Sequence, residues 1–223
     1  RNRSVMIVGS APNSTFNRYT EDMTIINING SIIRNVRDNI RNPHITFLDA
    51  EILDKKISSA KHSRRTIIEN GYLNVMNLGF VIQAQSNSSK GGLIRDITSE
   101  YSRDFFVNRN LRKFITLCVT RNIDFFRKKE GILSTGGFAI SLASLFKPKK
   151  IYLTGFSMYK SSSKDDPPHS YDNSDLKREY LNDTRSHSLA DSCLISSLRL
   201  RGIEIISDDY DLLPLLSNWG RNL

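Results

Sequence analysis

The sequence lacks any apolar stretch that could cross a membrane. Its 223 residues contain no apolar run close to the roughly 20 residues that a spanning helix needs. The first ten residues, RNRSVMIVGS, follow the pattern of a strand and contain no signal-peptide cleavage site. The chain begins with Arg1 rather than Met, so we expect a fragment and leave open an anchor or a second domain outside it.

Cysteine and the common nucleotide-binding signatures are also scarce. The two cysteines, Cys118 and Cys193, form no CxxC motif and no cluster with histidine, which argues against a structural zinc site. We predict two buried, reduced thiols and therefore a cytoplasmic location. The sequence contains neither GxGxxG nor GxxxxGK[ST], so a nicotinamide site and a nucleoside-triphosphatase site are both disfavoured.

The charge of the chain is basic, with 32 Lys and Arg against 23 Asp and Glu and a net charge of +9. The basic residues lie in scattered clusters, with no motif of a nucleic-acid module, so we expect no nucleic-acid partner. An anionic membrane leaflet and an anionic substrate stay open as partners, as does a merely solvated basic surface. The clusters are 61–65, 127–129, 147–150, Arg199 and Arg201.

The sequence does contain short apolar runs that alternate with helical patterns. Such alternation, with strands apolar on both faces, predicts an α/β fold with a doubly wound, mostly parallel, Rossmann-like sheet in a single domain, 1–223. We interpret 70–130, mostly helical from 99 to 129, as a helical insertion or lid, and 160–175 as a mobile loop. The predicted strands are 4–10, 22–30, 44–50, 79–87, 150–156 and 203–207, and the clearest helices are 31–42, 134–146 and 187–201.

Small or hydrogen-bonding residues follow several predicted strands. In an open parallel sheet, ligands bind beyond the carboxyl ends of the strands, and glycine lets a phosphate or a sugar approach the backbone closely. The candidate ligand-binding residues at these ends are Gly9, Ser10, Pro12, Asn29, Asp49, Ser157 and Tyr159.

The predicted helix at 134–146 begins with Ser134, Thr135 and Gly136. A helix N-terminus offers N–H groups and a partial positive charge to an anion, so this start is a candidate phosphate cradle. A serine or threonine before a helix also serves commonly as an N-cap alone. Both interpretations stay open on the sequence.

His187 opens another predicted helix, directly after the polar loop. A histidine in that place is neutral near pH 7 and can act as a general base. Asp191 follows one helical turn later, where it could orient the ring. The alternative is a surface histidine at a helix start.

Three segments together resemble the bacterial CMP-sialic-acid-dependent sialyltransferases of glycosyltransferase family 42. They are STGGFAISLASLFKPKKIYLTGFSMY, a polar loop with His and Tyr, and RSHSLADSCL. GSAPNS after the first strand is similar to the G-N-G-P-S of that family, and ING at Asn29 to its C-N-Q, while Asp49 falls where the family has Asn. The resemblance implies a GT-A-variant nucleotide-binding domain.

The resemblance also implies roles for individual residues. Ser10 and Asn29 would contact the phosphate and ribose of CMP, and Ser134, Thr135 and Gly136 would hold the nucleotide. Tyr159 and one loop residue, either Tyr171 or His169, would hydrogen-bond the departing phosphate. His187 would deprotonate the acceptor hydroxyl. Ser10 replaces an Asn of the family, and Ser157 replaces a frequent Asp, so the sugar specificity stays open.

The implied reaction is an inverting transfer of sialic acid from its CMP-linked donor to a hydroxyl of a cell-surface glycan. Heterolysis gives an oxocarbenium-like centre, and donors at the leaving phosphate stabilise the negative charge that develops there. The sugar carries its own carboxylate, so we expect no metal and no other cofactor. A CMP-Kdo-dependent transferase and a non-catalytic nucleotide- or sugar-binding module are the alternatives. The expected partners are the donor, a lipooligosaccharide or capsule acceptor and an anionic membrane face, with a homo-oligomer left open.

Overall fold

The computed structural model contains a seven-stranded sheet in which every pair of neighbouring strands is parallel. The structure describes residues 3–11, 20–49, 80–84, 104–107, 109–121, 133–156 and 185–207. The strands are β1 (Val5–Val8), β2 (Thr24–Ile28), β3 (Ile45–Asp49), β4 (Phe80–Ala84), β5 (Asp104–Val107), β6 (Lys150–Thr154) and β7 (Glu204–Ser207).

The strand order is β5-β4-β3-β2-β1-β6-β7. The chain therefore builds the sheet outward from β1 in one direction as far as β5, and then returns to the other side of β1 with β6 and β7. The order reverses between β1 and β6, where Val8 pairs with Thr154. In a doubly wound sheet this switch point is where ligands bind, beyond the carboxyl ends of the two strands.

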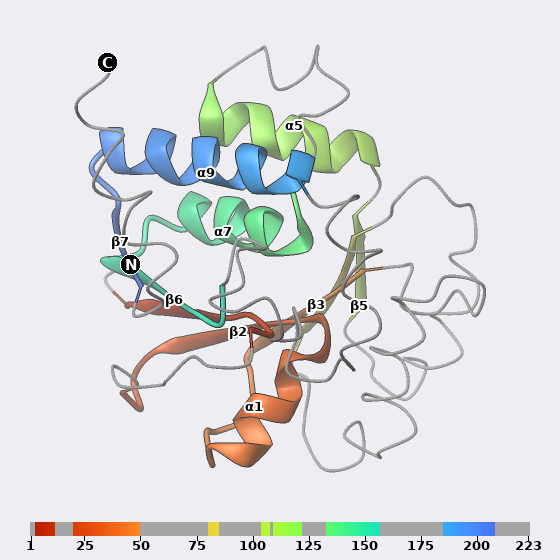
Figure 1. Ribbon diagram of the computed structural model, residues 1–223, viewed down its shortest axis with the longest axis vertical. Coiled ribbons are helices and arrows are strands. Elements are labelled where there is room, and N and C mark those ends of the chain that lie inside the picture. The colour runs from red at the N-terminus through yellow and green to blue at the C-terminus, as the bar shows by residue number, and fades with distance from the viewer. Residues whose placement is uncertain are drawn as a thin grey trace.

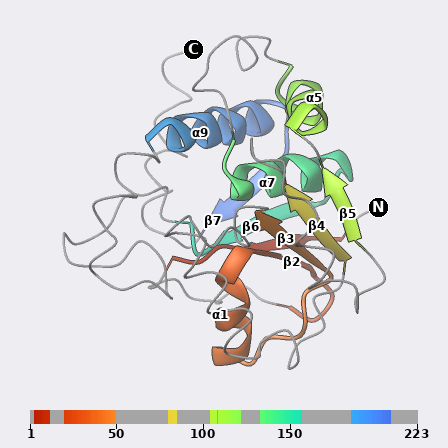
Figure 2. The same ribbon diagram turned by 90° about the vertical axis from the view of Figure 1, so that its right-hand side faces the viewer.

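Helices cover both faces of the sheet, as the prediction of a doubly wound fold requires (Figure 1). α7 (Thr135–Leu145) packs directly on β1, β2, β3 and β6, and α5 (Arg109–Thr120) and α9 (Arg185–Leu200) pack on α7 from outside. On the opposite face lies α1 (Ile32–Arg37), which follows the 3-10 turn η1 (Asn29–Ser31). Figure 2 shows the same arrangement edge-on, with α7 between the sheet and the outer helices.

The apolar core is divided between the two faces because side chains alternate along each strand. Val5 and Ile7 of β1 join the larger cluster beneath α7, whereas Met6 and Val8 join a smaller cluster on the α1 face. The larger cluster includes an edge-to-face pair of Phe47 and Phe138, with ring centroids 5.8 Å apart. α7 begins against this cluster, and its first turn lies at the carboxyl edge of the sheet.

The structure confirms the doubly wound parallel fold, and each of the six predicted strands contains an observed one. β5 is different, because it lies in a stretch predicted to be mostly helical. The prediction of two buried thiols is wrong for Cys118, which is exposed, while Cys193 is partly buried and both are free. Most of the proposed lid and the whole loop 160–175 lie outside the described residues. Among the described helices, none is both long and apolar enough to span a bilayer.

Candidate functional site

The switch point is formed by two glycines whose backbones touch. Gly9 N donates to Thr154 O at 2.7 Å, and Ala11 N donates to Gly155 O at 3.0 Å. A Cβ atom on Gly9 would overlap the carbonyl of Gly155, and Gly155 has a φ of +77°, which favours glycine. The ends of β1 and β6 therefore meet without a side chain between them, and we call this contact the glycine seam.

The N-terminus of α7 lies directly over this edge. A Cβ on Gly136 would lie 2.8 Å from the Phe156 ring and 3.4 Å from Ile28 Cδ1, and a Cβ on Gly9 would lie 3.2 Å from the same ring. Phe156 follows the seam and Ile28 ends β2. Three predicted ligand-binding positions, Gly9, Asn29 after Ile28, and Gly136, are thus brought together, although Gly136 is more than 100 residues from the other two in the sequence.

Ser134 is the N-cap of α7, so the structural interpretation of this residue is confirmed. Its Oγ accepts a hydrogen bond from Gly137 N at 2.9 Å. The same hydroxyl donates to Asp191 Oδ2, and Ser134 N donates to Asp191 Oδ1 at 3.0 Å. A hydroxyl has one proton to donate, and here that proton points to Asp191. Ser134 therefore shapes the helix start, and its side chain is not a donor for a ligand in this arrangement.

Asp191 connects α9 to the same place. Its carboxylate is 3% exposed and lies against the first turn of α7, where a Cβ on Gly137 would overlap it. His187 is in the first turn of α9, four residues before Asp191, which corresponds to about 6 Å along the helix axis. The backbone carrying His187 is therefore close to the start of α7, while the imidazole itself lies outside the described residues. The role of Asp191 in orienting that ring stays a prediction.

Asn29 lies in a tight turn after β2. Its φ is +50°, a left-handed conformation that asparagine adopts more readily than most residues. Ser31 Oγ accepts a hydrogen bond from Ile28 N at 2.9 Å, which closes the turn. Asn29 itself is half-buried at the carboxyl edge. This position is the one predicted for a contact to the ribose and phosphate.

Sequence reasoning missed Arg34, which is fully buried at the same edge. Its Nη1 donates to Gly9 O at 3.1 Å, and its Nη2 donates to Thr154 Oγ1 at 3.4 Å. The guanidinium therefore holds both strands at the switch point. In the sequence Arg34 is an ordinary charged residue in an amphipathic helix, and no local signal marks it as buried.

The other predicted site residues are less completely placed. Ser10 is half-buried directly after Gly9, Thr135 is buried in the first turn of α7, and Asp49 is the last residue of β3. Outside the described residues lie Pro12, Ser157, Tyr159, His169 and Tyr171. Their roles stay predictions, as does the role of His187.

Comparison with known proteins finds relatives by structure but not by sequence. No protein-family model matches the sequence, and no curated protein matches it significantly. Solved structures of sialyltransferases, in contrast, match nearly the whole chain. The chain has the fold of bacterial sialyltransferases. The predicted resemblance is thereby confirmed at the level of the fold.

Three of these structures illustrate the match. The monofunctional alpha-2,3-sialyltransferase Cst-I from Campylobacter jejuni has a TM-score of 0.55 and 14% identity, over 93% of this chain and 77% of its own. CstII in complex with a trisaccharide acceptor and CMP has a TM-score of 0.55 and 14% identity, over 92% and 80%. CstII from Campylobacter jejuni in complex with CMP-3FNeuAc has a TM-score of 0.51 and 12% identity, over 92% and 80%.

Proposed function

We propose that the protein is a CMP-sugar-dependent glycosyltransferase that transfers an acidic ulosonic sugar, sialic acid in the first instance, to a hydroxyl of a cell-surface glycan. One observation carries the proposal: the glycine seam, the start of α7 and the N-terminal part of α9 meet at the switch point. Solved sialyltransferases with this fold were crystallised with CMP, with a CMP-sugar analogue and with an acceptor. The site and the fold therefore support the same chemistry.

The glycines bring the parts of the site together. Without a Cβ, Gly9, Gly155 and Gly136 let the ends of β1 and β6 and the first turn of α7 pack closely, so that backbone N–H groups gather at the switch point where a nucleotide phosphate would bind. Because the Ser134 hydroxyl donates to Asp191, we propose that the backbone amides of Thr135 and Gly136 contact the phosphate instead. Asn29 would contact the ribose from the end of β2.

We propose that His187 acts as the general base. The acceptor hydroxyl must lose its proton while the CMP group leaves from the opposite face of the sugar, which gives inversion at the anomeric carbon. A positioned base contributes about 10²- to 10⁴-fold to such a step. Tyr159 and either Tyr171 or His169 would donate to the departing phosphate. Placement of His187 in the first turn of α9 supports this assignment.

Nucleotide binding tests the donor class first. Thermal shifts are measured with CMP, UMP, GDP and UDP, and we expect a clear preference for CMP. CMP release is then measured from CMP-Neu5Ac and from CMP-Kdo, with and without a lipooligosaccharide acceptor. Release from CMP-Kdo alone would identify the Kdo transferase, and CMP binding without release from either donor would identify the non-catalytic module. No preference for CMP would refute the proposal.

Two variants test the base. His187→Ala is expected to lower transfer by at least 100-fold while CMP binding stays within about threefold. His44→Gln is the control, because His44 lies at the opposite, amino end of the sheet, where its Nδ1 accepts a hydrogen bond from Ile25 N. Transfer at a wild-type rate in the His187 variant would show that another group is the base.

We propose that transfer needs no metal and that the protein works at an anionic membrane face. Activity should therefore persist in excess EDTA. This check is necessary because Asp209 and Asp211, outside the described residues, have the D-x-D spacing of a metal-binding carboxylate pair.

Membrane binding is tested by sedimentation of the protein with phosphatidylglycerol vesicles, and the bound fraction should decrease as the salt concentration rises. Several large apolar and basic residues are exposed and available for such contact: Phe114, Phe146, Leu200, Arg121, Lys147 and Arg201.

A further inference from the structure

Arg34 is a charged side chain to which the proposed reaction assigns no role. It comes from α1, on the face opposite α7, and its exposed fraction is 0%. A charge removed from water costs several kcal/mol unless partners compensate it. A buried charge directly beneath the switch point therefore requires an explanation.

The contacts of Arg34 place its charge within the glycine seam. Nη1 donates to Gly9 O at 3.1 Å and Nη2 donates to Thr154 Oγ1 at 3.4 Å, so one guanidinium bridges the ends of β1 and β6. A Cβ on Gly155 would overlap Nη1, so the group also packs against the second glycine of the seam. The guanidinium is held as a fixed charge at the carboxyl ends of β1 and β6.

The negative charge of Asp191 makes a positive charge at this edge favourable for anion binding. An α-helix N-terminus carries roughly half a positive charge, but the carboxylate of Asp191 already accepts two hydrogen bonds from Ser134 there. A full negative charge at the start of α7 opposes a second anion at the same helix end. A phosphate at this edge is therefore favoured when nearby cations offset Asp191. Two buried arginines lie near the edge: Arg112 donates to the carbonyl of Leu133, directly before Ser134, and Arg34 donates to Gly9 in the seam.

We infer that Arg34 supplies this charge and thereby determines how strongly the protein binds the phosphate of a CMP-linked donor. The inference rests on the proposed function. Arg34 acts through its field rather than as a direct ligand, because its two terminal nitrogens already donate to Gly9 and Thr154. In a poorly hydrated environment such a field is far stronger than in water.

The test compares CMP with cytidine, which lacks the phosphate. Affinities for both ligands are measured by calorimetry for the wild type, Arg34→Met, Arg34→Lys and Arg37→Met. Arg37 is the matched control, because it lies on the same helix and carries the same charge, but its side chain is 49% exposed. Near-UV and far-UV circular dichroism of each free variant establishes that it is folded.

We expect Arg34→Met to weaken CMP binding on the order of tenfold and to change cytidine binding by less than about twofold. Arg34→Lys should retain most of the preference for CMP, and Arg37→Met should retain all of it. A purely structural role predicts equal losses for both ligands. If Arg34→Met is not folded, Arg34→Gln replaces it, since its amide can still donate to Gly9 O.

The outcomes separate this inference from the proposed function. If the wild type prefers CMP and the neutral Arg34 variants keep that preference, the inference is wrong and the proposed function stands. Equal loss of both ligands, or loss of the preference in folded Arg34→Lys, also overturns the charge mechanism. A wild type that binds neither ligand removes the proposed function and this inference with it.

Discussion

The two faces of the sheet bury different kinds of side chain. The α7 face has the larger apolar cluster, which includes Phe47, Phe138 and Ile140, and two further helices cover α7. Its buried polar side chains lie mainly on the helices, among them Arg112, Ser141 and Asp191. The opposite face has a small apolar cluster around Met6 and Ile25 and a short helix. That face also buries four polar side chains completely: Asn27, Ser31, Arg34 and Asn35.

The two faces therefore contribute differently to the stability of the fold and to the geometry of the site. Apolar burial is non-directional and scales with area, so the α7 face supplies most of the free energy of folding. Hydrogen bonds are directional, and on the α1 face they link Asn27 to Asn35 at 2.8 Å and Arg34 to Gly9 at 3.1 Å. Both links lie at the carboxyl edge, where the turn with Asn29 must be held in place. The α1 face therefore positions the strand ends and the turn with Asn29, while Asp191 positions the start of α7 from the other face.

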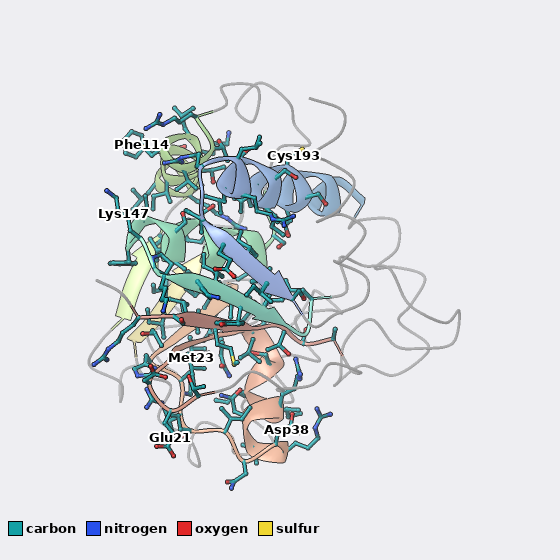
Figure 3. The ribbon with its side chains drawn as sticks, turned by 90° about the vertical axis from the view of Figure 1, so that its left-hand side faces the viewer. Glu21, Met23, Asp38, Phe114, Lys147 and Cys193 are labelled. Atoms are coloured by element: carbon teal, nitrogen blue, oxygen red, sulfur yellow. The ribbon has the colours of Figure 1, made fainter. Side chains whose placement is uncertain are left out.

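The largest predicted effect is on the apolar face. Phe138→Ala removes a ring that is 0% exposed and packs edge-on against Phe47, so we expect a loss of about 3–5 kcal/mol in the free energy of unfolding. Phe114→Ala is the control, because Phe114 of α5 is 59% exposed and projects from the outer side (Figure 3). Urea denaturation measures both, and equal losses would contradict the comparison.

The second largest loss of stability is expected at the glycine seam. Gly155 and Gly202 both have positive φ, +77° and +81°, so an alanine at either position costs about 1–2 kcal/mol in backbone energy. Only at Gly155 would the new Cβ overlap Arg34 and the Gly9 carbonyl, since nothing lies within 4 Å of the same position at Gly202. We expect Gly155→Ala to cost about 1–3 kcal/mol more than Gly202→Ala. Equal costs in thermal unfolding would mean that the seam can open.

The third predicted loss of stability concerns the buried amide pair on the α1 face. Asn35→Ala leaves the Asn27 amide without its acceptor, which is expected to cost about 1–3 kcal/mol. In a double-mutant cycle with Asn27→Ala, the coupling should be about 1 kcal/mol. Arg37→Ala, on the exposed side of the same helix, should change stability by less than about 1 kcal/mol. Additive losses at Asn27 and Asn35 would show that the pair does not act as a unit.

The smallest effect is a pH dependence at the amino end of the same face. Burial, followed by the charges of Arg41 and Arg3, lowers the pKa of His44 below its ordinary value of 6.5. The neutral ring accepts a hydrogen bond from Ile25 N at 3.0 Å. Because the folded-state pKa lies below the unfolded one, stability is fully present above about pH 6.5. It is lost as the pH falls below that value and through the lower folded-state pKa.

His44→Gln should make the urea midpoint less dependent on pH between 7.5 and 5.5. The effect is modest because the ring is only half-buried. An unchanged slope in the variant would assign the pH dependence to other groups. The carboxyl-edge contacts of Arg34 should be unaffected, because this guanidinium does not titrate in this range.

The strands could be predicted because most are short apolar runs that end in glycine or in a polar residue. Two such runs are VMIV and TIINI, which are too short for a helix and are followed closely by glycines that mark turns, so both are interpreted as strands. DFFV, the edge strand β5, is only four residues long and is surrounded by arginines, aromatics and helical spacing. A run of that length carries no periodicity of its own, so its pairing with β4 decides its structure.

The orientation of α1 could be predicted only in part. The spacing of Ile32, Ile33, Val36 and Ile40 predicts a buried face, and Ile32 and Ile40 are buried. Val36, however, is 40% exposed, and Arg34 and Asn35 are buried in its place. Helical periodicity assigns polar residues to solvent. Here hydrogen bonds from Asn27 and to Gly9 override that rule, and such partners are known only once the strands are placed.

The site was predicted in part. The positions of Gly9, Asn29 and Gly136 followed from the rule that ligands bind at the carboxyl ends of parallel strands, and the structure does bring them together. The use of Ser134 could not be decided, because its partner Asp191 is 57 residues away. A side chain that binds its own protein and one that binds a ligand have the same appearance in a sequence.

The glycine seam also limits how this protein could be re-engineered. Since Gly9 and Gly155 contact each other through their main chains, libraries for directed evolution that randomise these two codons should return mostly unfolded clones. Altered sugar preference has to be sought in the surrounding turns, where side chains can vary. Any homologue that accepts a different donor through this same framework should keep both glycines and differ in the turns around them.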